Sequence, residues 1–230
     1  MKFDIPTPSP ARRCISNIVL AILLTCIGVP KSAFAQAAAR RDPDPTAPEK
    51  KVIFIIDGAG LPQEKLDVVA DQVRGAIATF KPIQLFNIII VNENGISVLF
   101  PELSHATPES KRRFEPFIKQ LKKSSKHDVI PALSRALKEQ PDLIFLLAHE
   151  SFTDNDAVIK KAREINPKSM TIIDTLAFDP PDDDKAIGDT LKTIARNSGG
   201  TMKVVKTADI PEPAKPAPPP AHASSRAGSR

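Results

Sequence analysis

Two spacings of hydrophobic residues alternate along residues 50–208. Short, nearly continuous runs of apolar and β-branched residues predict buried strands, whereas apolar residues at every third or fourth position predict helices with one buried face. The continuous runs predict strands at 52–57, 86–91, 96–100, 143–148, 170–178 and 201–205. The helical spacing predicts helices that begin near Pro62, Thr107, Asp128, Thr153 or Asp154, and Asp182 to Asp184.

The connections between these elements predict how the strands pair. Asn94-Gly95 is a hairpin turn signal, so we expect strand 96–100 to run antiparallel to strand 86–91 at one edge of the sheet. Most of the other strands are separated by a helix, which is the connection that parallel neighbours need. The order predicts a doubly wound α/β fold, with a mostly parallel six-stranded sheet, one antiparallel edge strand, and helices on both faces.

The two ends of the chain differ in composition from the predicted domain at residues 50–208. Residues 1–35 resemble a signal peptide, because Arg12 and Arg13 precede an apolar stretch and Ala33-Phe-Ala forms a cleavage site. The apolar stretch is about a dozen residues, short of the roughly twenty that span a bilayer, so we expect cleavage, with an uncleaved anchor as the alternative. Residues 36–49 read as a proline-rich linker and residues 209–230 as a disordered tail rich in proline and alanine.

Composition excludes several classes of function for the exported chain. Cys14 and Cys26 both lie in the predicted signal, so disulfides, thiol catalysis and zinc-thiolate sites are not expected after cleavage. The formal net charge is +5, and the signal holds four basic residues and one acidic residue, which leaves about +2. The chain has no Trp or Tyr for base stacking. We therefore expect a protein of the periplasm or the cell exterior that binds neither nucleic acid nor, once cleaved, the membrane.

Two predicted strands end in a polar residue of chemical interest. The run Lys51-Val-Ile-Phe-Ile-Ile-Asp57 stops at an aspartate, and Gly58-Ala-Gly60 then turns into a helix. The run Leu143-Ile-Phe-Leu-Leu-Ala ends in His149 and Glu150 in the same way. Parallel strands deliver such residues to the carboxyl edge of the sheet, where open α/β sheets bind ligands.

The succession of motifs resembles the von Willebrand factor type A domain over nearly all of residues 51–205. The likeness rests on the strand ending in Asp57, the strand–hairpin–strand of 86–100, and three later segments: Ala106-Thr-Pro-Glu-Ser, Asp128-Val-Ile-Pro-Ala-Leu, and Asn197-Ser-Gly-Gly-Thr-Met-Lys-Val-Val. It is similar in particular to secreted bacterial members. The resemblance implies the strand order 3-2-1-4-5-6, with Asp57 and His149 side by side above the crevice between strands one and four.

The resemblance also implies a metal-ion-dependent adhesion site, which in the family is built from Asp-x-Ser-x-Ser, a threonine and an aspartate around Mg²⁺. Asp57 matches the first aspartate, but Ala59 and Leu61 stand where the two serines are expected. Because these positions supply no oxygen, we expect that the adhesion site is degenerate and does not hold Mg²⁺.

The remaining two ligand positions of the family carry histidines in this chain. His127 stands at the threonine, and His149 stands at the aspartate, with Glu150 in place of the glycine that follows. The loops that carry these residues form the predicted partner-binding crevice: Asp57, Gly58, Ala59, Gly60, His127, Asp128, His149 and Glu150. The expected function is an exported, non-catalytic protein–protein interaction module that needs no cofactor, with an unidentified protein partner.

Other interpretations of the same residues stay open at this point. Asp57 could simply accept hydrogen bonds from the backbone at the start of the next helix. Two imidazoles and a carboxylate, from His127, His149 and Asp57, suit Zn²⁺ or another transition metal better than Mg²⁺. A hydrolase is the least supported alternative, because there is no glycine-framed nucleophile elbow and His149 and Glu150 are expected to point in different directions. Lysines at 119, 122, 123 and 126 form a basic helix end, either a solvated surface or a docking site for an acidic one.

Overall fold

The computed structural model describes residues 50–210, apart from residues 124, 126 and 127. The predicted signal peptide at 1–35, the linker at 36–49 and the tail from residue 211 onward lie outside the described residues, as does His127. A short 3-10 turn, η1 (Thr207–Asp209), closes the described part, so the first predicted tail residue lies in this turn.

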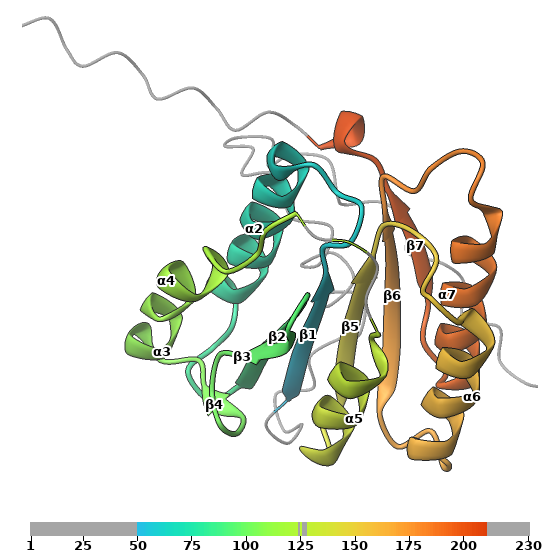
Figure 1. Cartoon of the computed structure of the whole chain (residues 1–230). Helices are drawn as coiled ribbons and strands as arrows, with labels where there is room; N and C mark the ends of the chain where they lie inside the picture. The colour runs from blue at the N-terminus through green and yellow to red at the C-terminus, as the bar shows by residue number, and fades with distance from the viewer. Residues whose placement is uncertain (1–49, 124, 126–127, 211–230) are drawn as a thin grey trace, which may run out of the picture.

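A single sheet runs through the domain in the order β3-β2-β1-β5-β6-β7 (Figure 1). Neighbouring strands are parallel except β2 and β3, which are antiparallel, so the predicted fold class and strand order are confirmed. The strands are β1 (Lys51–Asp57), β2 (Leu85–Asn92), β3 (Gly95–Val98), β5 (Leu143–Ala148), β6 (Ile172–Phe178) and β7 (Met202–Val205). A further two-residue strand, β4 (Ser104–His105), pairs antiparallel with the start of β2. β4 has no counterpart among the predicted strands, because a two-residue strand leaves no apolar run.

Helices cover both faces of the sheet, as predicted (Figure 1). One layer holds α2 (Gln63–Ala78), α3 (Pro108–Arg112) and α4 (Phe114–Ile118), and the other holds α5 (Ile130–Lys138), α6 (Asn155–Ile165) and α7 (Lys185–Asn197). The single helix expected after Thr107 is two short helices. Pro116 explains this break, since its ring clashes with the carbonyl of Arg112 and it has no N–H to donate. None of the described helices is both long and apolar enough to cross a membrane.

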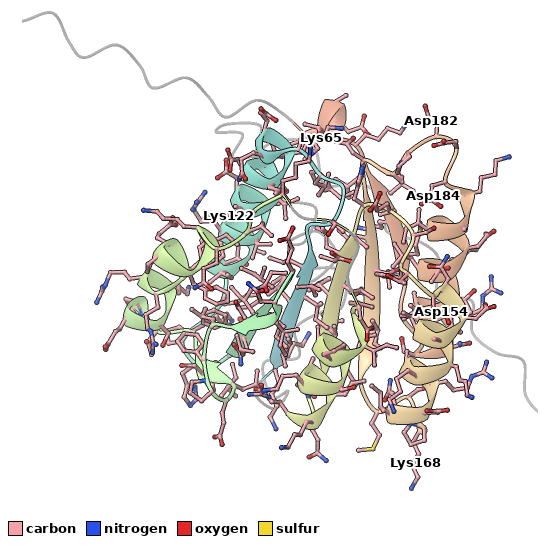
Figure 2. The ribbon with its side chains drawn as sticks, in the orientation of Figure 1. Lys65, Lys122, Asp154, Lys168, Asp182 and Asp184 are labelled. Atoms are coloured by element: carbon pink, nitrogen blue, oxygen red, sulfur yellow. The ribbon has the colours of Figure 1, made fainter. Side chains whose placement is uncertain are left out.

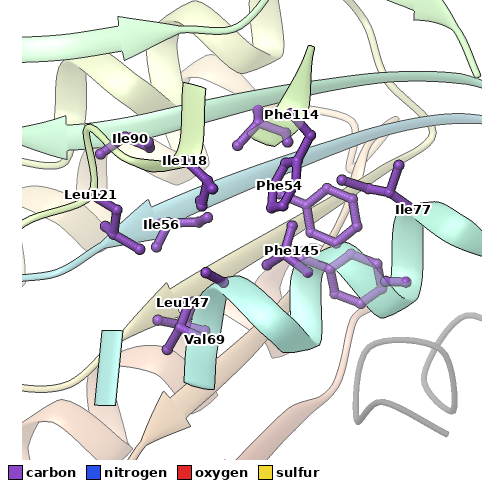
Figure 3. Packing of buried hydrophobic residues seen from close by; sticks show 14 of the residues in the cluster. Phe54, Ile56, Val69, Ile77, Ile90, Phe114, Ile118, Leu121, Phe145 and Leu147 are labelled. Carbon is purple, nitrogen blue, oxygen red and sulfur yellow. The ribbon is translucent and has the colours of Figure 1, made fainter. Parts of the chain in front are cut away.

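The core consists of two apolar layers that the alternation along the strands separates. In β1, Phe54 faces α2 and α4, whereas Ile53 and Ile55 face α5 and α7. Phe54 stacks on Phe145 of the neighbouring strand, with ring centroids 5.3 Å apart (Figure 3). Each such fully buried side chain contributes about 1.5–3 kcal/mol. Since the chain from residue 36 onward has no cysteine, this packing has to hold the domain without disulfides.

Polar residues start several elements where the sequence placed them. Thr107 accepts a hydrogen bond from the Ser110 N–H at 3.2 Å, and Asp154, rather than Thr153, caps α6 through the Ala157 N–H at 2.9 Å. In the hairpin, the turn residues are Glu93 and Asn94, and Gly95 opens β3 with a φ of 114° that favours glycine. The Asp154 cap and the hairpin turn lie at the carboxyl edge of the sheet, whereas Thr107 follows β4 beside the start of β2.

Candidate functional site

The carboxyl edge of the sheet brings Asp57 and His149 to the same place, because β1 and β5 are neighbours and Ile56 pairs with Leu147. Asp57 ends β1 and is only 3% exposed. Its Oδ1 accepts a hydrogen bond from the Ala59 backbone N–H at 3.0 Å. The carboxylate therefore stabilises the turn into α2, as the simplest interpretation of the sequence predicted.

The two positions where the resemblance expects serines are packed into the protein interior. Ala59 is 4% exposed and Leu61 is fully buried. The Leu61 side chain belongs to the apolar layer under α2, together with Leu66 and Val69. Both side chains consist of carbon, so this turn supplies packing where the family supplies hydroxyl ligands.

Gly60 passes directly against the two polar residues that follow β5. Its φ is 74°, and a Cβ built on it would lie 2.8 Å from the Glu150 carboxylate oxygen Oε2 and 3.0 Å from His149 Cδ2. The expectation that His149 and Glu150 point in different directions is therefore wrong. The strand ends at Ala148 and a bend follows, so the alternation of side chains stops before these residues.

His149 is fixed between two strands by one ring nitrogen. Its Nδ1 lies 2.9 Å from the backbone oxygen of Phe178, the last residue of β6. A carbonyl oxygen accepts and never donates, so Nδ1 carries the proton of the neutral ring, and the lone pair is on Nε2. This half-buried ring presents Nε2 as its acceptor or ligand atom.

Asp179 and Lys65 form a second polar group at this edge, which sequence analysis missed. The Lys65 ammonium on the first turn of α2, labelled in Figure 2, belongs to this group. It lies 3.2 Å from the carboxylate of Asp179, the residue directly after β6. Thr207 donates both its backbone N–H, at 2.9 Å, and its hydroxyl to the same carboxylate. Burial by itself raises the pKa of Asp179, but the hydrogen bonds from Thr207 and Lys65 outweigh it, so the pKa lies below its ordinary value. An aspartate just after a buried strand was the signal used for Asp57, and it applies here as well.

Ser151 and Asp184 join the loop after β5 to the start of α7. Asp184 accepts hydrogen bonds from the Ser151 N–H at 2.7 Å and from the Ser151 hydroxyl at 2.6 Å. It also caps α7 through the Ile187 N–H at 3.2 Å. Figure 2 shows Asp184 at the beginning of this helix. The hydroxyl nearest in sequence to His149 is therefore bonded to a helix-capping carboxylate.

The remaining predicted site residues are placed as follows. His127 lies outside the described residues, so the grouping of Asp57, His127 and His149 stays a prediction. Asp128 accepts a hydrogen bond from the Ile130 N–H at 2.8 Å at the start of α5. Gly58 lies in the turn after β1, where an added Cβ would lie 3.1 Å from Leu66. Among the described residues, no three His, Cys, Asp or Glu side chains are grouped so that they could hold a metal ion.

Comparisons with known proteins found similar structures and no similar sequence. No protein-family model and no curated protein matches the chain. A von Willebrand factor type A protein from Catenulispora acidiphila is similar in structure, with a TM-score of 0.58 and 18% identity over 70% of this chain and 39% of that chain. The SpRpn10 VWA domain has a TM-score of 0.50 and 15% identity over 70% of this chain and 89% of that domain. A variant of the PilB minor pilin from Streptococcus sanguinis has a TM-score of 0.52 and 12% identity over 73% of this chain and 59% of the pilin.

These likenesses concern the fold, since every identity is below a fifth. The matching region spans less than two thirds of the Catenulispora protein and of the pilin, so their remaining parts have no counterpart in the match. The strand order and the antiparallel hairpin edge agree with that fold. The chain therefore has a fold like that of the von Willebrand factor type A domain.

Proposed function

We propose that this chain is an exported, non-catalytic protein-interaction module, which contacts a partner protein through the crevice loops without the family's cation. The observation that carries the proposal is the filling of the two serine positions by the buried carbon side chains of Ala59 and Leu61. Mg²⁺ prefers six oxygen ligands, and this turn offers no side-chain oxygen beyond Asp57. The loss of these two hydroxyls supports a crevice that works without Mg²⁺.

The polar groups of the crevice support a binding role over catalysis. A catalytic hydroxyl needs a base within hydrogen-bond reach. The Ser151 hydroxyl does have a carboxylate within reach, Asp184, but this carboxylate also accepts the Ser151 N–H and caps α7, which is the pattern of a structural contact. His149 Nδ1 is bonded to a backbone carbonyl. These bonds hold the loop after β5 in place, with the half-buried side chains of His149 and Glu150 at its start.

A transition-metal site is the alternative, and the orientation of His149 favours it. The carbonyl that holds Nδ1 leaves Nε2 as the ligand atom, which is how second-shell groups orient metal-bound imidazoles. Asp57 and His127 were the partners that the sequence named. A hydrolase stays a second, weaker alternative, for which the described residues offer the hydroxyl of Ser151 and the carboxylate of Asp184.

Calorimetric titration of the EDTA-treated full chain with Mg²⁺, Mn²⁺, Zn²⁺ and Ni²⁺ separates these functions. The proposal expects no heat of binding for any of the four ions. Micromolar binding of Zn²⁺ or Ni²⁺ that His149→Ala abolishes would favour the transition-metal alternative. Binding of Mg²⁺ or Mn²⁺ would overturn the proposal, because it would show that a working adhesion site exists.

A crosslinking experiment tests the interaction itself. A photo-crosslinking residue at position 150 should attach the chain to one protein of the exported fraction, and EDTA should leave that adduct unchanged. The matched control is the same crosslinker at Lys138, which is exposed at the end of α5, near Lys51 and Leu85 at the starts of β1 and β2 and so at the opposite edge of the sheet. Adducts of equal yield at both positions, or none at position 150, would contradict a role for the crevice.

A further inference from the structure

The outer edge of β3 carries backbone groups that point away from the sheet. β3 is the last strand in the sheet order, and it pairs only with β2 among the described residues. The Leu99 N–H donates to the Ile88 carbonyl at 2.9 Å, which fixes which residues face inward. Because inward and outward groups alternate along an antiparallel strand, the backbone groups of Ser97 face β2, whereas those of Ile96 and Val98 face outward.

Apart from its short length of four residues, this edge lacks the devices that usually protect a strand from pairing. Gly95-Ile-Ser-Val98 contains no lysine and no proline, and its last three residues are only half-buried. The opposite edge strand, β7, carries Lys203 and is followed directly by Lys206. Charged side chains on an edge discourage another chain from adding to it. The β3 edge is therefore more open to an added strand than the β7 edge.

A basic groove lies beside the same edge. It measures about 470 Å³ and runs between the hairpin and the segment after α4. Ile96 and Ser97 line one side, and the exposed Lys122 and Lys123 line the other, with Glu93 as the acidic residue of the lining. These lysines belong to the basic helix end that the sequence singled out, of which Lys126 lies outside the described residues. The surplus positive charge favours an acidic occupant.

We propose that the free edge of β3 captures an extended acidic segment of a partner protein as an added strand. The backbone of the segment pairs with Ile96 and Val98, and its carboxylates contact Lys122 and Lys123. This inference rests on the proposed interaction function and names a second surface and the chemistry of its ligand. Main-chain hydrogen bonds supply affinity in such complexes, and side-chain contacts in the adjoining groove supply specificity.

The chain's own tail is a poor occupant of this edge. Residues 211–230 contain prolines at 211, 213, 216 and 218 to 220, which cannot donate a backbone hydrogen bond. The tail also has more basic than acidic residues, as does the groove. Both features favour a separate acidic segment.

Fluorescence anisotropy with the full chain and synthetic peptides tests the proposal. The probe is a labelled peptide of about eight residues that alternates valine with aspartate or glutamate. One comparison peptide carries lysine at the acidic positions, and another is N-methylated at alternate backbone amides. We expect the acidic peptide to bind in the micromolar range, and we expect both comparison peptides to bind at least about tenfold more weakly.

Two pairs of variants separate backbone pairing from charge. Val98→Pro removes both the valine side chain and the outward backbone N–H. Val98→Ala removes the side chain but keeps the N–H, so only the proline variant should abolish binding. Lys122→Glu with Lys123→Glu should weaken binding at least about tenfold, whereas Lys160→Glu with Lys192→Glu makes the same charge change on α6 and α7 and should not. Circular dichroism of every variant confirms that it is folded.

Amide hydrogen exchange of Ile96 and Val98 gives the structural readout. The acidic peptide should protect both amides.

Equal binding of the N-methylated peptide, or equal loss in Val98→Ala and Val98→Pro, would overturn the proposal. Protection that grows with protein concentration would assign the edge to a second copy, and protection lost on removing residues 211–230 would assign it to the tail. A failed peptide experiment with an intact position-150 crosslink would reject this edge alone and leave the crevice function standing.

Discussion

At the residue scale, carboxylates at the ends of strands hold together the segments at the carboxyl edge of the sheet. Asp57 accepts a hydrogen bond from its own turn, and Asp179 gathers Thr207 and Lys65. The signal of an acidic residue after a buried strand was visible at both positions, although sequence analysis used it only for Asp57. The orientation of His149 and Glu150 was not predictable from alternation, because the strand ends at Ala148.

Asp179→Asn should lower the free energy of unfolding by roughly 1–2 kcal/mol at pH 7. Asparagine tolerates the φ of 43° at this position, so the change isolates the charge. Since the folded pKa lies below the unfolded one, the carboxylate stabilises fully above about pH 4 and loses this contribution as the pH falls through the folded pKa. Urea denaturation at pH 7, 4 and 3 should show the gap to wild type closing.

Asp182→Asn is the matched control for this measurement. Asp182 also pairs with a lysine, Lys206, but at 3.9 Å and with a fully exposed side chain. Its replacement should leave the stability unchanged at every pH. A gap between wild type and Asp179→Asn that is the same at pH 3 and pH 7 would contradict the role given to the Asp179 charge.

At the element scale, the hairpin edge is held by a side chain as well as by its ladder. Asn87, fully buried in β2, accepts a hydrogen bond from the Phe100 N–H at 3.1 Å and donates to the Phe100 carbonyl at 2.9 Å. Its amide also donates, at 3.2 Å, to the carboxylate of Glu139, the residue that follows α5. The side-chain amide thus continues the pairing of β2 beyond the end of β3 and holds the backbone of Phe100, where the chain leaves the sheet.

Asn87→Ala should lower the free energy of unfolding by about 2–4 kcal/mol, because it leaves buried backbone groups of Phe100 and the Glu139 carboxylate without this partner. Chemical denaturation measures the change. Asn92→Ala is the comparison on the same strand. Asn92 bonds Ser97 and Asn94 at the half-exposed end of the hairpin, so its loss should be about 1 kcal/mol or less. Equal losses in the two variants would show that burial of Asn87 is not what matters.

At the scale of the whole molecule, the sheet is complete only with its last strand. β7 pairs with β6 along its length, and Val205 is buried in the layer under α2. The following residue pair, Lys206 and Thr207, leads into the contact with Asp179. These contacts join the end of β7 to the edge of the sheet that carries Asp179.

Residues 50–210 by themselves should unfold within about 3 °C of the full chain, if the outlying segments add nothing to the core. A chain that ends at residue 198 lacks β7 and the Thr207 contacts, and its midpoint should fall by more than about 10 °C, or it should not fold. Thermal unfolding followed by circular dichroism measures both. A large loss in residues 50–210 would mean that segments outside this range pack on the domain.

The sequence by itself determined the order of strands and helices, apart from β4 and the break between α3 and α4, and the antiparallel hairpin at the carboxyl edge of the sheet, because the period of burial and the turn residues are local properties. It also located Asp57 and His149 at that edge. Only the tertiary structure decided that Gly60 lies against His149 and Glu150, that Lys65 reaches Asp179, and that Ile96 and Val98 face outward. These facts depend on how separate segments meet across the sheet, and no spacing along the chain records such distances.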